Sequence, residues 1–220
     1  MKRTVSLLAL TALVILTSCW KKDDTILYRD VTMATATGSS QFVTDLGITY
    51  NVVKSEVEGD FSGLGRVLIY CNVLKYTGTN EFDIQLVNLI TPLNKDAVAT
   101  STLTKPDDGL GNDPIGISAA WVSGGYLNMS IGVLMLDEEK EHRINLEFDD
   151  TAPADTLRFT LRHDDGMPDD MNVIAEDSKI GVAYVTFPIA KLLPEGVKTL
   201  PIKLTWTWDK EYCSKDDLKL

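Results

Sequence analysis

The two histidines of the chain are the first side chains to consider for catalysis or metal binding. His142 and His163 both fall in register with the core-facing residues of expected strands, one at a strand start and one at a strand end. Such a pair could share a metal ion or transfer a proton. Neither has a flanking cysteine or carboxylate at the spacing of a zinc site. We therefore favour hydrogen-bonded structural histidines at the rim of the fold, with a ligand site as the alternative.

Tryptophan side chains are candidates for stacking against a sugar. Trp121, together with Trp206, Trp208 and Tyr126, could form such a platform, because a flat aromatic face matches the apolar face of a pyranose. Trp206 and Trp208 alternate with aliphatic residues on one strand face, which is typical of core positions. We expect these two in the core and keep Trp121 as a candidate ligand contact.

Two acidic loops, residues 107–113 and 164–170, offer many oxygen atoms, which are the ligands that calcium prefers. Neither loop has the spacing of an EF-hand. Aspartate, glycine and proline are also the residues of solvated turns, because their side chains or backbones favour turn conformations. We favour turns, leave calcium binding as the alternative, and predict no metal site.

No motif for a catalytic nucleophile or a cofactor is found in the chain. It has no G-x-S-x-G, no phosphate loop with G-K-[ST], no H-E-x-x-H and no dinucleotide fingerprint. Glycoside hydrolysis needs two carboxylates across a cleft, and among 32 acidic residues no such pair can be identified. We expect a protein that is not an enzyme and needs no cofactor.

Cys19 has the most definite predicted chemistry. It follows Leu16, Thr17 and Ser18, and small residues just before a cysteine allow the chain to enter a signal peptidase. The pattern resembles the bacterial lipobox, in which the thiol is the nucleophile that receives a diacylglyceryl group. Acyl chains would anchor the protein stably, since each buried methylene contributes about 0.8 kcal/mol. The alternative is a free cysteine after an ordinary signal peptide.

Residues 1–18 form the expected signal peptide. Lys2 and Arg3 supply a positive start, and residues 5–16 carry no charge. This uncharged run is too short for a permanent membrane span, which takes about 20 apolar residues. Lipid on Cys19 is therefore the expected anchor.

Lys22, Asp23 and Asp24 follow the cysteine closely. A lysine followed by two acidic residues resembles the signal that exports lipoproteins of some Gram-negative anaerobes to the outer face of the outer membrane. The alternative is a short solvated tether on the periplasmic face. We expect a lipid-anchored protein of the outer membrane, exposed at the cell surface.

The chain is acidic, with a formal charge of −11 at pH 7. Loss of residues 1–18 would remove two of the 21 basic residues and none of the 32 acidic ones, which changes this charge to −13. Such a charge repels nucleic acid and anionic headgroups. The expected partners are the membrane, through the N-terminal lipid alone, and an unidentified protein or glycan, but not nucleic acid.

Cys71 and Cys213 could form a disulfide in an oxidising compartment. Cys71 lies within an apolar, strand-like run, where a cysteine behaves as a small hydrophobic residue. We favour a buried free thiol for Cys71.

Period-two alternation dominates the chain after the signal, and no segment shows helical spacing over an ordinary helix length. The expected class is all-β. Expected strands cover residues 46–53, 66–76, 82–91, 127–135, 142–148, 157–163, 183–189 and 202–208.

A dense cluster of turn formers, residues 105–114, gives the expected domain boundary. Before it, several short strands indicate a small Greek-key barrel. After it, five or more half-buried strands indicate a β-sandwich. The expected organisation is a signal peptide, a lipidated tether, a barrel domain and a sandwich domain, over residues 1–18, 19–29, 30–105 and 106–220.

Short stretches in a fixed order suggest a family. They are GRVLIY at 65–70, LNKDAV at 93–98, NDPI at 112–115, GYLNM at 125–129, HRINL at 142–146 and LRH at 161–163. In this order, and with the lipobox, they resemble the NigD-like lipoproteins. The resemblance implies an N-terminal OB-like barrel followed by a C-terminal immunoglobulin-like β-sandwich. It also suggests a bacteriocin-immunity role, and it supplies no catalytic residues.

The sequence thus predicts a lipid-anchored, non-catalytic binding protein of the bacterial outer membrane or cell surface, of the bacteriocin-immunity type. The alternative is a surface lipoprotein that binds a glycan or nutrient, and a hydrolase is a more distant third. Fold alone does not choose among them.

Overall fold

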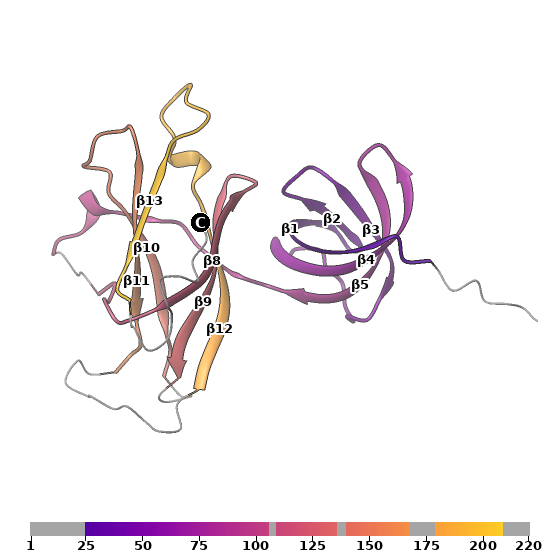
Figure 1. Cartoon of the computed structure of the whole chain (residues 1–220), viewed down its shortest axis with the longest axis horizontal. Coiled ribbons are helices and arrows are strands. Elements are labelled where there is room, and N and C mark those ends of the chain that lie inside the picture. Colours follow the sequence, from indigo (N-terminus) through magenta and orange to yellow (C-terminus); the bar gives the residue numbers. More distant parts are fainter. Residues whose placement is uncertain (1–24, 106–108, 136–139, 168–178, 209–220) are drawn as a thin grey trace, which may run out of the picture.

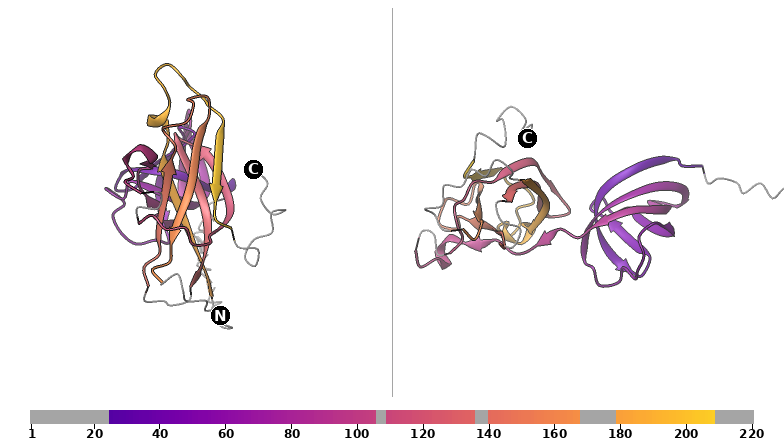
Figure 2. Two further views of the ribbon diagram at one scale, coloured as in Figure 1. Left: turned by 90° about the vertical axis from the view of Figure 1, so that its left-hand side faces the viewer. Right: turned by 90° about the horizontal axis from the view of Figure 1, so that it is seen from below.

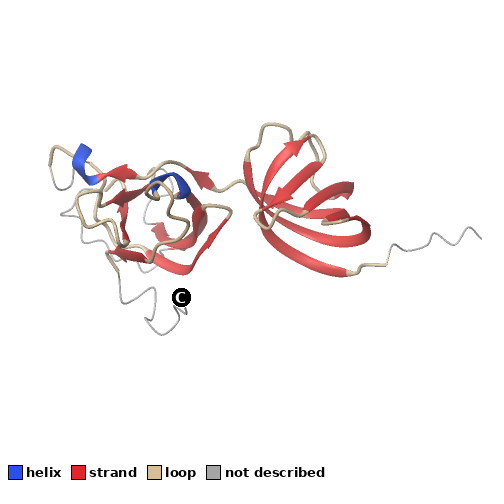
Figure 3. Ribbon diagram, turned by 90° about the horizontal axis from the view of Figure 1, so that it is seen from above, coloured by secondary structure: helices blue, strands red, loops and turns tan. Residues whose placement is uncertain are grey.

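The computed structural model describes residues 25–105, 109–135, 140–167 and 179–208. Figure 3 shows strands nearly throughout, with two short helical turns at Thr100–Thr102 and Ala190–Leu192. The predicted all-β class is confirmed. Within these ranges, no helix has the length and apolar character needed to cross a membrane.

The N-terminal strands close into a five-stranded barrel. Their order around the barrel is β1-β2-β3-β5-β4. Neighbours are antiparallel except β3 and β5, which are parallel. This confirms the expected OB-like barrel. The strands are β1 (Tyr28–Gly38), β2 (Gln41–Thr44), β3 (Thr49–Ser55), β4 (Arg66–Gly78) and β5 (Glu81–Ile90).

Alternation explains the barrel core. In a strand, successive side chains point to opposite faces, so every second residue of a closed barrel enters its interior. Val67, Ile69, Cys71 and Val73 of β4 follow this rule and are buried in one cluster. Phe42 of β2 and Tyr50 of β3 belong to the same cluster.

The C-terminal strands form two four-stranded sheets, in the orders β13-β11-β10-β7 and β6-β12-β9-β8. Their inner faces share one core, which is separate from that of the barrel. The expected β-sandwich is confirmed. Its strands are β6 (Leu93–Asn94), β7 (Val98–Ala99), β8 (Gly116–Ser123), β9 (Tyr126–Met135), β10 (Arg143–Phe148), β11 (Leu157–Asp164), β12 (Lys179–Pro188) and β13 (Ile202–Trp206).

The start of the sandwich requires a correction to the expected boundary at residues 105 and 106. β6 pairs with β12 and β7 pairs with β10, so sandwich strands already begin at Leu93. The cluster of turn formers at 105–114 lies between two sandwich strands rather than between the barrel and the sandwich. A two-residue strand is too short to show alternation. Its pairing partner also lies far away in sequence, so no local signal marks it.

The barrel and the sandwich lie side by side and are joined by the chain between β5 and β6 (Figures 1 and 2). The turn between β8 and β9 points from the sandwich toward the barrel in Figure 1. β9 is buried on both faces at its middle. Asn128 of this strand is 0% exposed and contacts the barrel through Arg66. The junction therefore contains buried polar groups.

Candidate functional site

A buried ion pair lies on the barrel side of this junction. Arg66, the first residue of β4, donates two hydrogen bonds to the carboxylate of Asp45, with distances of 2.8 Å to Oδ1 and 2.7 Å to Oδ2. The two side chains are 2% and 7% exposed. A bidentate arginine–carboxylate pair has a fixed geometry. The pair therefore holds the turn after β2 against the start of β4.

The sandwich completes this pair from the β8–β9 hairpin. Asn128 Oδ1 accepts a 2.8 Å hydrogen bond from Arg66, and Ser123 donates one of 2.5 Å to Asp45. The guanidinium carbon of Arg66 lies 3.8 Å from the ring centroid of Tyr126, a cation–π contact. We call Arg66, Asp45, Ser123, Tyr126 and Asn128 the junction network. It ties the barrel to the sandwich through buried, directional bonds.

Gly124 explains how the hairpin comes so close. Its φ is +57°, and a Cβ at this position would lie 2.4 Å from Asp45 Oδ1 and 2.6 Å from Asp45 Cγ. Only glycine fits this approach without a shift of the carboxylate. The turn sequence therefore determines how closely the two parts pack.

A cavity of about 490 Å³ lies beside the junction network, between the barrel and the sandwich. Its barrel wall is mainly aliphatic and includes Val31, Leu46 and Leu68. Its sandwich wall carries Trp121 and Tyr184 together with serine hydroxyls. Trp121, predicted as a ligand contact, therefore lines a cavity of the size range found for small-molecule sites.

The two predicted histidines do meet. His142 Nδ1 lies 2.8 Å from His163 Nε2, and the ring planes are nearly parallel, at 8°. His163 Nδ1 lies 2.9 Å from the carbonyl oxygen of Pro114. A carbonyl only accepts, so His163 Nδ1 carries the hydrogen, and a neutral His163 then accepts at Nε2 from His142. Both nitrogens of His163 are used within the protein.

This arrangement fits the structural role favoured from the sequence. His163 is 2% exposed, and burial lowers its pKa because the charged form loses its water. A metal ion could bind His163 only after one of its two hydrogen bonds broke. Among the described residues, no serine, threonine or cysteine is bonded to either ring. Within that part of the chain, the pair therefore has no nucleophile of the kind found in a catalytic triad.

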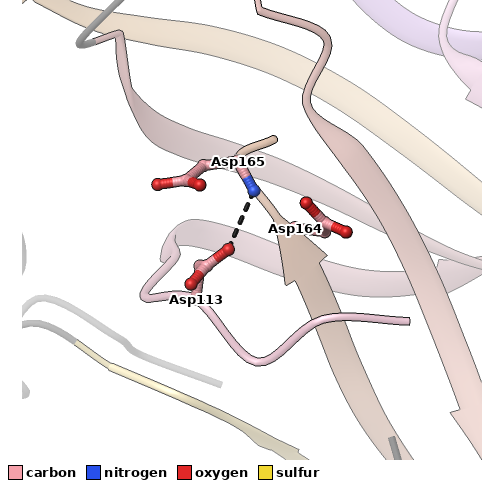
Figure 4. Close-up of side chains that lie close together, drawn as sticks. All are labelled: Asp113, Asp164 and Asp165. Carbon is pink, nitrogen blue, oxygen red and sulfur yellow. Dashed lines mark hydrogen bonds between the residues drawn. The ribbon is translucent and has the colours of Figure 1, made fainter. Parts of the chain in front are cut away.

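The two acidic loops converge beside the histidine pair. Oxygen atoms of Asp113, Asp164 and Asp165 lie within 4.8 Å of one another. Figure 4 shows the carboxyl groups of Asp164 and Asp165 on opposite sides of the strand end, with Asp113 near them. Gly111 permits this approach, because a Cβ there would lie 2.3 Å from the carbonyl oxygen of His163. The two loops were separate calcium candidates in the sequence, and the structure brings them to one place.

Each of these carboxylates already accepts a hydrogen bond from the protein. Asp113 accepts from the backbone N–H of Asp165 at 2.9 Å, and Asp165 accepts from that of Met167 at 2.8 Å. Asp164 forms an ion pair with Arg143. Burial raises the pKa of Asp113, since desolvation disfavours its charged form. Such local bonds are typical of turns, the role favoured from the sequence.

Trp206, Tyr126 and Cys71 also have a place in the structure. Trp206 packs against the sandwich core, as expected. Tyr126 holds Arg66 over its ring, so the four aromatic residues do not form one platform. Cys71 is a free thiol in the barrel core, as expected, and burial raises its pKa to about 12.

The lipidation and export residues lie outside the described residues. These are Leu16, Thr17, Ser18 and Cys19, then Lys22, Asp23 and Asp24; Cys213 and parts of both acidic loops also fall outside. Sequence reasoning did not identify the junction network. Its polar members look like solvent-facing residues of ordinary strands, and nothing local signals that a second domain covers them.

Comparison with known proteins identifies the second half of the chain. Residues 98–219 match the NigD-like C-terminal beta sandwich domain, which is more than half of the chain. No curated protein matches the sequence.

Several solved structures share the fold. A NigD-like immunity protein from Bacteroides caccae ATCC 43185 is 19% identical, with a TM-score of 0.60 over 84% of this chain and 88% of that one. A candidate toxin-related protein from Parabacteroides distasonis ATCC 8503 is 23% identical, with a TM-score of 0.60 over 82% and 88%. A candidate lipoprotein from Bacteroides fragilis NCTC 9343 is 17% identical, with a TM-score of 0.58 over 84% and 90%. At these identities the likeness establishes the fold alone.

Proposed function

Because this chain belongs to the NigD-like family, we propose that it is a non-catalytic, lipid-anchored binding protein that gives its cell immunity to a secreted toxin. In this role the folded part meets the toxin at the outer membrane or cell surface and blocks it by binding. The name of the similar immunity protein from Bacteroides caccae supports this choice of role.

The observation that carries the binding function is the junction network. Arg66, Asp45 and Asn128 hold the barrel and the sandwich in one orientation through bonds buried from water. A fixed orientation lowers the entropy lost on association, because the two surfaces do not have to be ordered by the partner. The protein can then present residues from both parts to one partner.

The state of His163 supports binding rather than catalysis. His163 uses both ring nitrogens inside the protein, and the clustered carboxylates accept hydrogen bonds from nearby backbone groups. A catalytic acid or base needs a free atom that faces its substrate. An immunity role needs no such atom.

Lipid attachment at Cys19 supplies the location in this proposal. The small residues before Cys19 and the charged residues Lys22, Asp23 and Asp24 after it support an anchored, surface-exposed protein. In this position the chain meets a toxin before the toxin reaches the inner membrane.

The proposal is tested by deleting the gene and challenging the cells with a panel of bacteriocin-producing neighbours. Deletion should sensitise the cells to at least one producer, and the wild-type gene should restore growth. A Cys19→Ala gene should fail to restore it, with loss of palmitate labelling and membrane fractionation. Equal growth of deleted and wild-type cells against every producer would reject the immunity role.

The same assay separates binding from catalysis. His142→Gln should protect as well as wild type, because no chemistry at this ring is required. Protease treatment of intact cells is a separate test, of location: it should degrade the wild-type protein if the protein is displayed outside. Loss of protection by His142→Gln in a protein of normal abundance would contradict the non-catalytic role.

A further inference from the structure

The cavity at the junction has two walls of different chemistry. On the barrel side, Val31, Leu46 and Leu68 present aliphatic groups. Val31 is 56% exposed and Leu46 is 79% exposed, so apolar surface continues to the mouth of the cavity. Exposed apolar residues that gather at a cavity indicate a site that a ligand covers.

The sandwich wall offers hydrogen-bond acceptors as well as donors, because its lining residues carry serine hydroxyls, the indole N–H of Trp121 and the hydroxyl of Tyr184. Ser118 donates its hydroxyl hydrogen to Ser130, whose Oγ lies at 2.9 Å, and Ser123 donates to Asp45. A serine has one hydrogen and two lone pairs, so a serine that donates inside the protein keeps acceptor capacity. A ligand with its own O–H or N–H donors fits this wall.

The cavity carries no uncompensated charge. Asp45 is the one ionisable carboxylate among the described lining residues, and Arg66 neutralises it through two hydrogen bonds. An ammonium ligand would therefore find no free counter-charge, and an anion would face the acidic protein as a whole. A neutral ligand is favoured.

Trp121 indicates a third property of the ligand. Its indole lines the cavity together with Tyr184, and an aromatic ring packs well against a flat face of C–H groups. The ligand should then be neutral, rich in O–H donors, and apolar on one face. Among common biological compounds, a pyranose combines these three properties.

We propose that this junction cavity binds a neutral saccharide unit, stacked on Trp121 with its hydroxyl groups donated to Ser118 and Ser123. The aliphatic barrel wall covers the other side of the sugar. Ser123 already accepts a hydrogen bond from Asn128 and Ser130 accepts one from Ser118, so a purely aliphatic ligand would leave the hydroxyl oxygen of Ser118 without a donor, which is costly in a desolvated site. This site goes beyond the immunity role and does not depend on it.

The test is a titration of the detergent-solubilised, full-length mature protein with neutral monosaccharides and oligosaccharides of glucose, galactose, mannose and N-acetylglucosamine. At least one sugar should bind and shift the tryptophan fluorescence. Trp121→Ala should lower the affinity at least about tenfold, and Ser118→Ala should lower it severalfold. The control Trp206→Phe, which alters a core-packed tryptophan away from the cavity, should bind as wild type does.

Leu46→Asp provides a variant whose fold is not at risk, because this side chain is largely exposed at the cavity mouth. It should also weaken saccharide binding. The proposal is overturned if no sugar of the panel binds, or if binding survives both Trp121→Ala and Leu46→Asp. It is also overturned if acetyl-leucinamide or acetyl-tryptophanamide binds the cavity and the sugars do not, since the cavity would then receive an apolar side chain of a polypeptide.

The saccharide titration is independent of the toxin assay. A Trp121→Ala strain that has lost saccharide binding but remains protected would separate the two functions. Failure of the immunity role would leave the measured saccharide affinity unchanged.

Discussion

His163 is the residue whose burial has the clearest consequence for pH dependence. A histidine in an unfolded chain titrates near pH 6.5, whereas desolvation lowers the pKa of His163 in the folded protein. Below about pH 6.5 the unfolded state therefore binds more protons than the folded state. The free energy of unfolding should fall from about pH 6.5 toward the lowered pKa, by at most about 1.4 kcal/mol per pH unit from this group. Urea denaturation at several pH values measures it.

His163→Gln is the variant that tests this prediction. Its free energy of unfolding should depend less steeply on pH over the same interval, because the titrating ring is absent. Asp113, whose raised pKa acts in the opposite direction, is present in both proteins, but His163 contributes to its shift, so the difference measures His163 together with its interaction with Asp113. Equal slopes for wild type and variant would show that His163 does not titrate in this way.

Elements are held together at the junction by one ion pair between β4 and the turn after β2. Arg66→Met leaves a nearly buried Asp45 carboxylate without its partner, and such a change costs about 3–5 kcal/mol. Asp45→Leu should have a similar cost, because Arg66 is then unpaired. The double variant should lose clearly less than the sum of the two, since no unpaired charge remains. Chemical denaturation of the four proteins measures the coupling, and additive losses would mean that the pair contributes no specific interaction.

At the scale of the whole molecule, the separation of the barrel and the sandwich depends on how closely the β8–β9 hairpin approaches the barrel. Gly124→Ala places a methyl group against Asp45 and should push the hairpin away. Small-angle X-ray scattering should then show a larger radius of gyration. Gly47→Ala is the matched control, because Gly47 also has a positive φ, of +75°, in the turn that holds Asp45, but no atom lies within 4 Å of the added Cβ. It should lose about 1–2 kcal/mol through backbone strain alone. Identical scattering for the two variants would contradict this account of the junction.

Strand positions were predicted where alternation is clear, whereas β1 and β8 were not among the expected strands. β11 alternates strictly, with Leu157, Phe159, Leu161 and His163 buried, as the sequence indicates. β9 is different at Asn128, a polar residue that is fully buried. Asn128 is bonded to Arg66 of the barrel, which lies more than fifty residues away in sequence.

The sequence by itself determined the all-β class, the barrel and the sandwich, because alternation and turn residues are local and act within each strand. It also determined that His163 faces a core, since register fixes the side on which a side chain lies. Tertiary structure alone decided that His142 bonds His163, that β6 and β7 join the sandwich sheets, and that Arg66, Asp45 and Asn128 form one network. The physical reason is that hydrogen bonds and cavities form between segments distant in sequence, whose approach depends on the packing of the whole chain.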